Sequence, residues 1–463
     1  MLKAPIIEME IAVGRRGLSL ALLLGSTLTT GMLSVSVNPA QAQRTLPDGQ
    51  MVTPPSGIAR PEDAGVRART TIKLFTPADG PVNISPPSPR NGAVPEELPP
   101  FPGLYTWNTP ASLACVYRLV PVEDESCNPY VVTQNPSAGS RAIAIVDAFD
   151  APNATTDLAA FSAQFGLPPA DLHKIYASAG SCSPGGTQPG YDPGWASEET
   201  LNIEWAHAMA PGARIYLVEA ASDALSDLLT AVTVANQCLA ASGGGEVSMS
   251  WGLEEFSAET ALDGVFTQPG VVYFAGAGDG SSLLYPSASP NVVSVGGTSL
   301  VRNLLPWRGN PGDFQGEAVW SWGSAAGTGA GPSAYEPRPH YQDRIQNIVG
   351  SSRGAPDVAA VADPSTGVWI YVSGWYLVGG TSVSTPIWAG IVNAAGRFSA
   401  STAAELTQIY SRSFPFAEIP LGFSDISSGT CGMSVTGVFD IYLASLGWDF
   451  CSGVGSPLGY FGK

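Results

Sequence analysis

Short runs of apolar, often β-branched residues alternate with helical patterns through most of this chain of 463 residues. We expect a strand at each of six such runs, at 142–146, 214–218, 246–250, 271–274, 292–295 and 368–372. Helical patterns occur at about 155–165, 198–210, 222–241 and 382–397. Apolar strands separated by helices indicate a parallel sheet that is covered on both faces. The sequence therefore predicts an α/β fold with a doubly wound, mostly parallel sheet, whose chemistry gathers where strands end and helices begin.

Residues 1–42 have the pattern of a secretory signal peptide. Arg15 and Arg16 precede an apolar stretch that begins at Leu18, and Ala40-Gln41-Ala42 offers a small-x-small cleavage pattern. A membrane anchor is the alternative, because the apolar segment is nearly long enough to span a bilayer. If the signal peptide is cleaved after Ala42, we expect a secreted protein, extracellular or periplasmic, with no stable membrane association.

Residues 43–103 differ in composition from the rest of the chain. Prolines crowd this stretch, and it has no sustained apolar period. We interpret it as an extended linker or a short propeptide, mostly without a core of its own. From about residue 104 the pattern is globular and continues to residue 463 without a repeat or a second linker. We therefore expect a single domain over 104–463.

The chain is strongly acidic and poor in histidine. It has 21 Lys and Arg against 39 Asp and Glu, a formal net charge of −18 and an isoelectric point near 4.5. A surface of this sign repels phosphate backbones, which excludes nucleic acids as partners. Histidine occurs only at His173, His207 and His340, which limits the catalytic bases that the chain can use.

An even set of six cysteines fits disulfide formation after export. Fifteen pairings are possible, and the sequence alone does not choose among them. Short loops favour Cys115–Cys127 and Cys431–Cys451, with Cys182 and Cys238 left over. A metal cluster is less favoured, because the chain has no CxxC spacing and few histidines.

A candidate nucleophile lies in the segment Gly379-Gly-Thr-Ser-Val-Ser-Thr-Pro386, which opens the helix expected at 382–397. The glycines permit a tight approach, and we expect Pro386 in an early helical turn, where its missing N–H matters little. Ser382 is then close to a helix N-terminus, where unpaired N–H groups and the positive dipole end stabilise an oxyanion. Taken alone, the same segment is also typical of an ordinary capped helix after a Gly turn.

The full Gly-Thr-Ser-x-x-x-Pro pattern resembles the nucleophile motif of the subtilisin-like fold, which two peptidase families share. The subtilisins need a His base in a Gly/His-rich helix start, and no histidine of this chain has that surrounding pattern. The sedolisins (kumamolisin-like serine-carboxyl peptidases) use Glu instead of His. The chain is similar to the sedolisins from about Leu104 to its end, which implies a subtilisin-like α/β fold.

The segment Trp195–Pro211 looks like the helix that carries the base in sedolisins. In that family a Glu and an Asp stand four residues apart, on one face of the helix. The matching positions here are Glu198 and Asn202, so the Glu is retained and the Asp is replaced. Asn removes the like-charge repulsion that raises the pKa of the base. We expect its amide to donate a hydrogen bond to Glu198.

Two further residues resemble members of the same network. Asp147 ends the first expected strand, at a place where kumamolisin-like enzymes carry an accessory Glu; a strand-end turn or helix cap is the alternative. Trp251, in Ser-Met-Ser-Trp-Gly, matches a Trp of the network, with core packing as the alternative.

The expected strand 271–274 leads to Asp279, in Ala-Gly-Ala-Gly-Asp-Gly-Ser-Ser. Sedolisins place an Asp in a Gly-Asp-Ser-Gly turn, where its protonated carboxyl donates a hydrogen bond to the oxyanion. A carboxylic acid donates only when it is neutral, which ties this role to acidic pH or a raised pKa. Asp279 alone would suggest a hairpin turn, but its order between Glu198 and Ser382 favours the functional interpretation.

Two motifs near the C-terminus, Ser424–Gly429 and Leu446–Pro457, resemble the calcium site of the family. The resemblance implies two carboxylate ligands and three carbonyl ligands, from Asp425, Asp449, Ile426, Ser445 and Gly447. Calcium prefers such oxygen ligands, although two loop aspartates by themselves are usually solvated turns. Ser445 stands where the family has Gly, which need not disturb a carbonyl ligand. Calcium is therefore the expected cofactor.

The resemblance implies a secreted, monomeric serine-type endopeptidase that hydrolyses proteins or peptides at acidic pH. In this role Ser382 attacks the peptide carbonyl, Glu198 transfers the proton and Asp279 supports the oxyanion. Because Asn202 replaces the family Asp, we expect the activity to be weakened or shifted in pH. A catalytically inactive secreted pseudopeptidase, acting as a binding or scaffold protein, is the alternative. Residues 43–103 are too few for the family's large folded propeptide.

Overall fold

A computed structural model of the protein describes residues 49–77, 107–119, 137–302, 314–323, 326–412, 422–432 and 441–463. These residues belong to one compact unit that spans Leu46–Lys463. The expected signal peptide at 1–42 lies outside the described residues, as does the alternative membrane anchor. No helix in the described ranges is long and apolar enough to cross a membrane.

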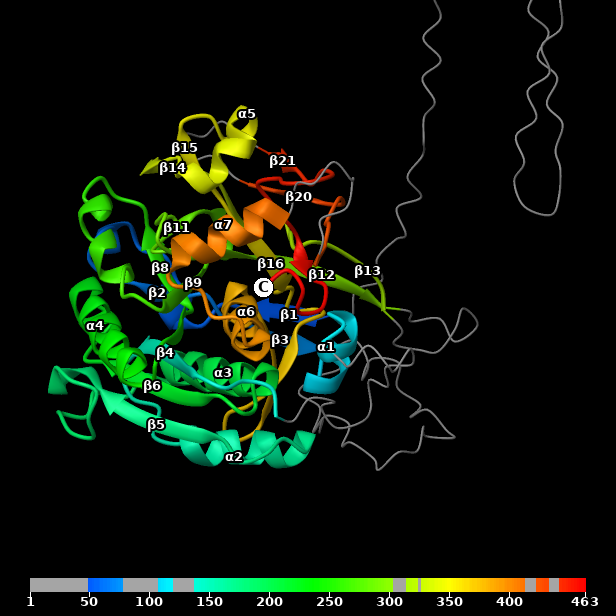
Figure 1. Ribbon diagram of the computed structural model, residues 1–463. Coiled ribbons are helices and arrows are strands. Elements are labelled where there is room, and N and C mark those ends of the chain that lie inside the picture. Colours follow the sequence, from blue (N-terminus) through cyan, green and yellow to red (C-terminus); the bar gives the residue numbers. More distant parts are fainter. Residues whose placement is uncertain are drawn as a thin grey trace, which may run out of the picture. The chain divides into compact units, whose positions relative to one another are not determined.

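A central sheet of eight strands organises the unit (Figure 1). Its members are β4 (Ala142–Ala148), β5 (Asp171–Tyr176), β6 (Arg214–Ala220), β7 (Gly245–Met249), β9 (Val271–Gly276), β12 (Val293–Arg302), β13 (Phe314–Val319) and β16 (Val358–Val361). The order is β13-β12-β9-β7-β4-β6-β5, and β16 also pairs with β12. Every pairing is parallel except that of β13 with β12. The sheet is therefore mostly parallel, as the sequence predicts.

Helices cover both faces of this sheet, with α3 (Pro193–Met209) and α6 (Thr381–Ala395) on one face and α4 (Leu225–Ala241) on the other. The remaining helices are α1 (Pro110–Val116), α2 (Ala154–Phe165), α5 (Gln346–Val349) and α7 (Thr402–Arg412). Successive residues of β4 point to opposite faces: Ile143 and Ile145 join the cluster formed with α3 and α6, whereas Ala144 and Val146 join the cluster formed with α4. The expected α/β fold is confirmed.

Smaller elements surround the central sheet. One antiparallel sheet has the order β1-β3-β18-β17, made of Gly49–Val52, Lys73–Pro77, Trp375–Gly379 and Val368–Tyr371. The strand expected at 368–372 thus forms, but outside the parallel sheet. The other short strands are β2 (Arg69–Thr70), β8 (Trp251–Glu254), β10 (Gly280–Ser282), β11 (Leu284–Tyr285), β14 (Gly327–Pro337), β15 (Ser352–Ala355), β19 (Phe423–Ser424), β20 (Thr430–Cys431), β21 (Tyr442–Leu443) and β22 (Ser456–Pro457). Short 3-10 helices occur at Pro55–Gly57, Pro61–Asp63, Ala177–Ala179, Glu259–Ala261, Asp263–Phe266 and His340–Ile345.

The boundary predicted at residue 104 is wrong for the described part of the linker, residues 49–77. This segment contributes β1, β2 and β3, and β3 lies between β1 and β18 in one sheet. Ile72 and Phe75 are buried in the same cluster as α3 and α6. The prolines nearby suggest an extended chain, but the strand is stabilised by a partner about 300 positions later in the sequence. The folded unit therefore begins well before residue 104.

Two disulfides have both partners in the described residues: the favoured pair Cys431–Cys451 and the pair of the two cysteines left over, Cys182 and Cys238. Cys115 is disulfide-bonded as well, and Cys127 lies outside the described residues.

A buried ion pair ties the strands at one side of the sheet to α7. Arg353 Nη2 donates to Asp357 Oδ2 at 2.5 Å, and neither side chain is exposed. Asp357 also accepts from the Ser294 N–H and the Tyr410 hydroxyl, each at 2.8 Å. These contacts join β12, β15, the start of β16 and α7. Removing the arginine leaves a buried carboxylate without its counter-charge.

We predict that Arg353→Met lowers the free energy of unfolding by about 3–5 kcal/mol, because it breaks a buried pair and leaves one charge uncompensated. Urea unfolding followed by tryptophan fluorescence measures the change. The matched control is Arg338→Met, which removes an exposed pair with Asp343 and should change stability by about 0–1 kcal/mol. Equal losses in both variants would contradict the prediction.

Candidate active site

Ser382 lies in the first turn of α6, directly after β18 and a sharp glycine turn. Gly380 precedes the helix with φ of 96°, a backbone conformation that favours glycine. A Cβ at this position would lie 1.9 Å from the carbonyl oxygen of Thr71, so only glycine fits. The Ser382 side chain is fully buried.

Pro386 lies inside α6, in an early turn as expected, but past the first positions of the helix, whose N–H groups have no helical partner. A proline at this position leaves the carbonyl of Ser382 without its usual helical partner. The Ser250 hydroxyl lies 3.3 Å from that carbonyl oxygen. The proline is therefore accommodated by a side chain from the end of β7.

Glu198 lies in α3 and points at Ser382. The helix begins at Pro193 after Asp192, whose carboxylate accepts hydrogen bonds from the N–H groups of Gly194 and Trp195. Ser382 Oγ donates to Glu198 Oε2 at 2.8 Å, and both side chains are buried. The structure therefore brings the candidate nucleophile and the candidate base into direct contact.

The close approach of the two helices depends on small residues. A Cβ at Gly390 of α6 would lie 2.6 Å from the Cβ of Met209 and 3.1 Å from the carbonyl oxygen of Ala206, both in α3. A larger residue at this position would push the helices apart and with them Ser382 and Glu198.

Asn202 interacts with two carboxyl groups of the site. Its amide nitrogen donates to Asp147 Oδ2 at 2.8 Å. A side-chain hydrogen bond from Asn202 also lowers the pKa of Glu198. The carbonyl oxygen of the Asn202 side chain accepts from the Ser250 hydroxyl at 2.8 Å. Asn202 therefore links Asp147, at the carboxyl end of β4, to the serine that lies beneath α6.

The pKa values of two carboxyl groups in this cluster, those of Glu198 and Asp147, are raised. Burial raises the pKa of Glu198 well above its usual range, and the nearby charge of Asp147 raises it further. Burial likewise raises the pKa of Asp147, while the hydrogen bond from Asn202 lowers it. Although Asn202 carries no charge, a second carboxyl group therefore still influences the candidate base.

Asp279 lies at the N-terminus of α6, beside Ser382. Its Oδ1 accepts from the N–H of Thr381 at 2.8 Å and from the Thr381 hydroxyl at 2.9 Å, while Oδ2 faces Lys73 Nζ at 3.6 Å. Burial raises the pKa of this carboxyl, and Lys73 lowers it. Asp279 therefore lies in the turn that follows β9, and its carboxyl group caps the helix that carries Ser382.

Trp251 and the three histidines take other roles. The indole N–H of Trp251 donates to the carbonyl of Val146 at 2.8 Å, so the ring packs in the core and contacts the backbone just before Asp147. The histidines bond to Asp171, to the carbonyl of Pro168 and to Asp343. Ser382 Oγ therefore donates to a carboxyl group, and none of the histidines in the described ranges hydrogen-bonds to it.

Sequence reasoning missed three residues at the site: Ser250, Thr71 and Lys73. Thr71 Oγ1 lies 2.9 Å from Ser382 Oγ. Ser250 was visible as the last residue of a predicted strand, a position where side chains meet at the sheet edge. Thr71 and Lys73 gave no comparable signal, because they lie in the segment interpreted as a linker.

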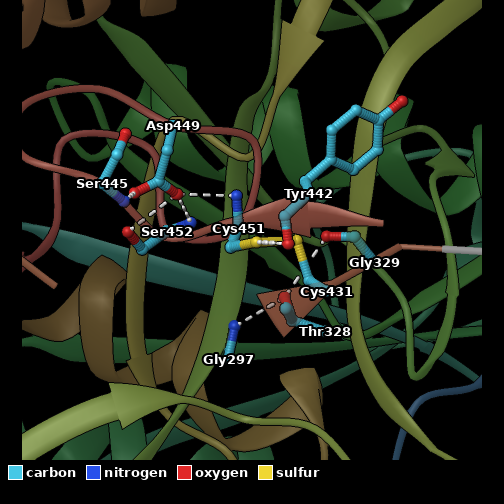
Figure 2. The surroundings of a disulfide bond; sticks show 9 residues. All are labelled: Gly297, Thr328, Gly329, Cys431, Tyr442, Ser445, Asp449, Cys451 and Ser452. Carbon is cyan, nitrogen blue, oxygen red and sulfur yellow. Dashed lines mark hydrogen bonds between the residues drawn. A yellow bond between two sulfur atoms is a disulfide. The ribbon is translucent and has the colours of Figure 1, made fainter. Parts of the chain in front are cut away.

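The residues of the predicted calcium site gather around one turn. Asp449 Oδ2 accepts from the N–H of Ser445 at 2.9 Å, and Asp425 Oδ2 accepts from the N–H of Gly447 at 3.2 Å. Figure 2 shows the Asp449 carboxylate directed at the backbone of Ser445, Cys451 and Ser452, beside the Cys431–Cys451 disulfide.

One side of this turn carries a carboxylate oxygen that is suited to a cation. Asp425 Oδ1 is buried without a hydrogen-bond partner in the described residues, and burial raises the pKa of Asp425. Burial also raises the pKa of Asp449 to about 6. No group of three or more His, Cys, Asp or Glu side chains suited to a metal is found in these ranges, so a cation here would need backbone carbonyls among its ligands.

Comparison of the sequence with curated proteins identifies the family of this chain. The chain is 32% identical to kumamolisin of Bacillus sp. (strain MN-32) over 332 residues, which are 66% of this chain and 56% of that protein. It is 34% identical to sedolisin of Pseudomonas sp. (strain 101) over 187 residues, 38% of this chain and 30% of that protein. The chain belongs to the sedolisin family. It spans about half, or less, of the length of these relatives.

A solved structure of Pseudomonas sedolisin has the same fold. That serine-carboxyl proteinase, complexed with two molecules of pseudo-iodotyrostatin, matches with a TM-score of 0.58 and 24% identity, over 76% of this chain and 95% of that one. No family model matches the sequence. Membership of the sedolisin family therefore rests on the curated relatives, and the solved structure supports the fold.

We predict that Asp147→Asn lowers the pKa of Glu198, because it removes the nearby carboxyl group that raises it. Since Glu198 must be ionised to accept the Ser382 proton, acylation of Ser382 by a fluorophosphonate should begin at a pH lower by about one unit. The labelled fraction, measured by mass spectrometry across a pH series, checks this.

Asp171→Asn is the control for this variant, because Asp171 is exposed at the edge strand β5. Its labelling profile should match that of the parent chain. A profile in Asp147→Asn that stays in place or moves to higher pH would contradict the prediction.

Proposed function

We propose that this protein is a secreted serine-type endopeptidase of the serine-carboxyl type, which hydrolyses peptide bonds at acidic pH. The observation that carries the proposal is the 2.8 Å hydrogen bond from Ser382 Oγ to Glu198 Oε2, at the N-terminus of a helix. A buried serine that donates to a carboxyl group is suited to nucleophilic attack, because the carboxylate accepts the hydroxyl proton. The peptidase relatives support the same reaction class.

In the proposed mechanism, Ser382 Oγ adds to the peptide carbonyl carbon and its proton moves to Glu198. Glu198 then gives the proton to the leaving amine, and water hydrolyses the acyl-serine with the same help. The N–H of Ser382 and a protonated Asp279 stabilise the oxyanion. Because burial raises the pKa of Asp279, the donor form is favoured at acidic pH.

Asn202 changes the proton pathway beyond Glu198. An amide holds Asp147 in place but does not take up a proton, so the base lacks a second carboxyl group in direct contact. Because this second carboxyl group is missing, we expect slower hydrolysis than in an enzyme with Asp at position 202. The missing group also favours the second candidate, a secreted pseudopeptidase that acts as a binding or scaffold protein.

Calcium is the proposed cofactor. Asp425 and Asp449 would supply carboxylate oxygens, and Ile426, Ser445 and Gly447 would supply carbonyl oxygens. The ion would brace the turn at 445–449, which lies beside the Cys431–Cys451 disulfide. In this proposal the ion takes no part in the reaction at Ser382.

We also propose that the protein is exported, on the basis of its expected signal peptide and its disulfides. The disulfides fit an oxidising compartment, extracellular or periplasmic. Proteins or peptides are the proposed substrates and a monomer is the proposed state. The acidic composition makes nucleic acids unsuitable partners.

We predict that Ser382→Ala lowers peptide hydrolysis by about 10³-fold or more, because it removes the nucleophile. Digestion of a peptide library from about pH 3 to about pH 7 is followed by mass spectrometry. Ser384→Ala is the matched control: it lies two residues further along α6, and its hydroxyl donates to the carbonyl of Thr381. Hydrolysis by the parent chain that persists in Ser382→Ala would reject the mechanism. No hydrolysis by the parent at any pH would favour the pseudopeptidase.

We predict that removing calcium with EGTA lowers the melting temperature by about 5 °C or more relative to saturating calcium, because the ion binds only the folded chain. Asp425→Asn should abolish the difference, whereas the exposed Asp171→Asn should retain it. Calcium content, measured by atomic emission after gel filtration, gives an independent result. A chain without bound calcium and with one melting temperature in both conditions would reject the site.

A further inference from the structure

Two buried carboxyl groups lie side by side at the carboxyl ends of β4 and β6. The two strands are parallel, and their register places Asp147 next to Glu219. Ile145 of β4 and Leu217 of β6 belong to the cluster that packs against α3. Since side chains alternate along a strand, Asp147 and Glu219 point to the same face as these two residues. Both carboxyl groups are therefore directed at α3, and neither is exposed.

A third carboxyl group meets this pair from α3. Glu199 follows the candidate base directly in the sequence, and its side chain is also fully buried. The carboxyl group of Glu199 hydrogen-bonds to that of Glu219. Such a bond forms only when one of the two groups carries a proton, because an ionised carboxylate has no donor. Glu199 and Glu219 therefore hold a proton between them.

Lys174 on β5 supplies the counter-charge for Glu219. Lys174 Nζ lies 2.8 Å from Glu219 Oε1 and 2.5 Å from Asp150 Oδ1, and it donates to the carbonyl of Ala151 at 2.9 Å. The N–H of Ala151 donates to the same Glu219 oxygen at 3.1 Å. An ammonium group and an N–H on one oxygen stabilise the ionised form of that carboxyl group. In the shared pair, the proton therefore belongs to Glu199 and the negative charge to Glu219.

The ionised Glu219 acts on Asp147. Burial raises the pKa of Asp147, and the charge of Glu219 raises it further. Asp147 Oδ1 is buried without a hydrogen-bond partner in the described residues, which also favours the protonated form. A protonated Asp147 no longer repels a negative charge on Glu198. The charge on Glu219 therefore favours the ionised form of Glu198, which accepts the Ser382 proton.

Three other titratable groups face this cluster. Asp279 lies on the Ser382 side, and its charge raises the pKa of Glu198. Asp150 and Tyr176 lie beside Lys174. Although burial raises the pKa of Asp150, the bond from Lys174 holds it below its usual value, so Asp150 stays ionised. Burial raises the pKa of Tyr176, which stays neutral. Neither residue beside Lys174 therefore changes its charge at mildly acidic pH.

We propose that Glu219 is a positioning residue for the peptidase reaction: held ionised by Lys174 and Glu199, it keeps Asp147 protonated and leaves the negative charge on Glu198. The inference rests on the proposed function and deepens it. It assigns to β6 the carboxyl group that position 202 lacks. Asn202 fits this role, because its amide donates to Asp147 Oδ2 and leaves Oδ1 to carry the proton.

The first test is fluorophosphonate labelling of Ser382 across a pH series. Glu219→Gln removes the charge and keeps the size of the side chain, so Asp147 ionises more readily and Glu198 less readily. The labelling profile should move to higher pH by at least about 0.5 unit. A profile that stays in place or moves to lower pH would overturn the proposal.

Glu246→Gln is the matched control for this variant. Glu246 is a buried carboxyl group of the same sheet, and burial raises its pKa to about 8. It lies beside Ile143, near the start of β4, whereas Asp147 lies near the end. Its labelling profile should match that of the parent chain, and melting curves verify that both variants fold. Equal shifts in Glu219→Gln and Glu246→Gln would mean a general loss of packing and would contradict the assigned role.

A double variant tests whether Glu219 acts through Asp147. In Asp147→Asn the group that Glu219 controls is absent. Adding Glu219→Gln to this variant should therefore not move the labelling profile to higher pH. A move of about half the original size or more would contradict the positioning role.

Lys174→Gln tests the counter-charge. Without the ammonium group Glu219 becomes protonated, so the labelling profile should move in the same direction as in Glu219→Gln. The two changes should not add in a double variant. Arg214→Gln is the control, because Arg214 is half-exposed at the start of β6 and pairs with Asp171. An unmoved profile in a folded Lys174→Gln chain would overturn the role of Lys174.

A measurement on an inactive chain separates failure of this inference from failure of the proposed function. In Ser382→Ala, NMR of isotope-labelled aspartate carboxyl carbons follows the titration of Asp147, whose signal is identified by its loss in Asp147→Asn. Adding Glu219→Gln should lower the titration midpoint of Asp147 by about one unit or more. If the parent chain neither hydrolyses peptides nor is labelled, the function fails and the midpoint still tests the coupling. An unchanged midpoint would overturn the inference even in an active enzyme.

Discussion

The contact between Ser382 and Glu198 depends on the packing of α3 against α6. The two helices follow strands of different sheets, β5 and β18, yet they meet closely enough for a hydroxyl to donate to a carboxyl group at 2.8 Å. Gly390 permits this approach, and Gly380 sets the angle at which α6 begins. The Asp192 cap fixes the start of α3, the helix that carries Glu198. The chemistry proposed for the protein thus follows from backbone geometry that larger side chains at the two glycines would disturb.

Local patterns in the sequence predicted most of the scaffold. The apolar runs at 142–146 and 271–274 form β4 and β9, and the helical patterns at 198–210 and 382–397 form most of α3 and α6. Burial on both faces gives such strands a continuous apolar signal that needs no knowledge of their partners. The placement of Ser382, Glu198 and Asp279 at helix starts and strand ends was predictable for the same reason.

Contacts made by residues far apart in the sequence were not predictable. β3 is stabilised by β18, and nothing in the run around Lys73 indicates that partner. The orientation of Asn202 depends on competition between two carboxyl groups, and the structure assigns its amide to Asp147. Such choices follow from distances in the folded state, which spacing along the chain does not contain.

The four-stranded sheet β1-β3-β18-β17 attaches the N-terminal segment to the strand that leads into α6. β1 pairs with β3 from Gly49–Pro77 to Val52–Leu74, and β3 pairs with β18. The pair Arg67–Asp223 and the β2–β8 ladder hold the same segment elsewhere. Without β3, β18 would become an edge strand, and its unpaired backbone groups would be open to another extended chain directly before the helix that carries Ser382.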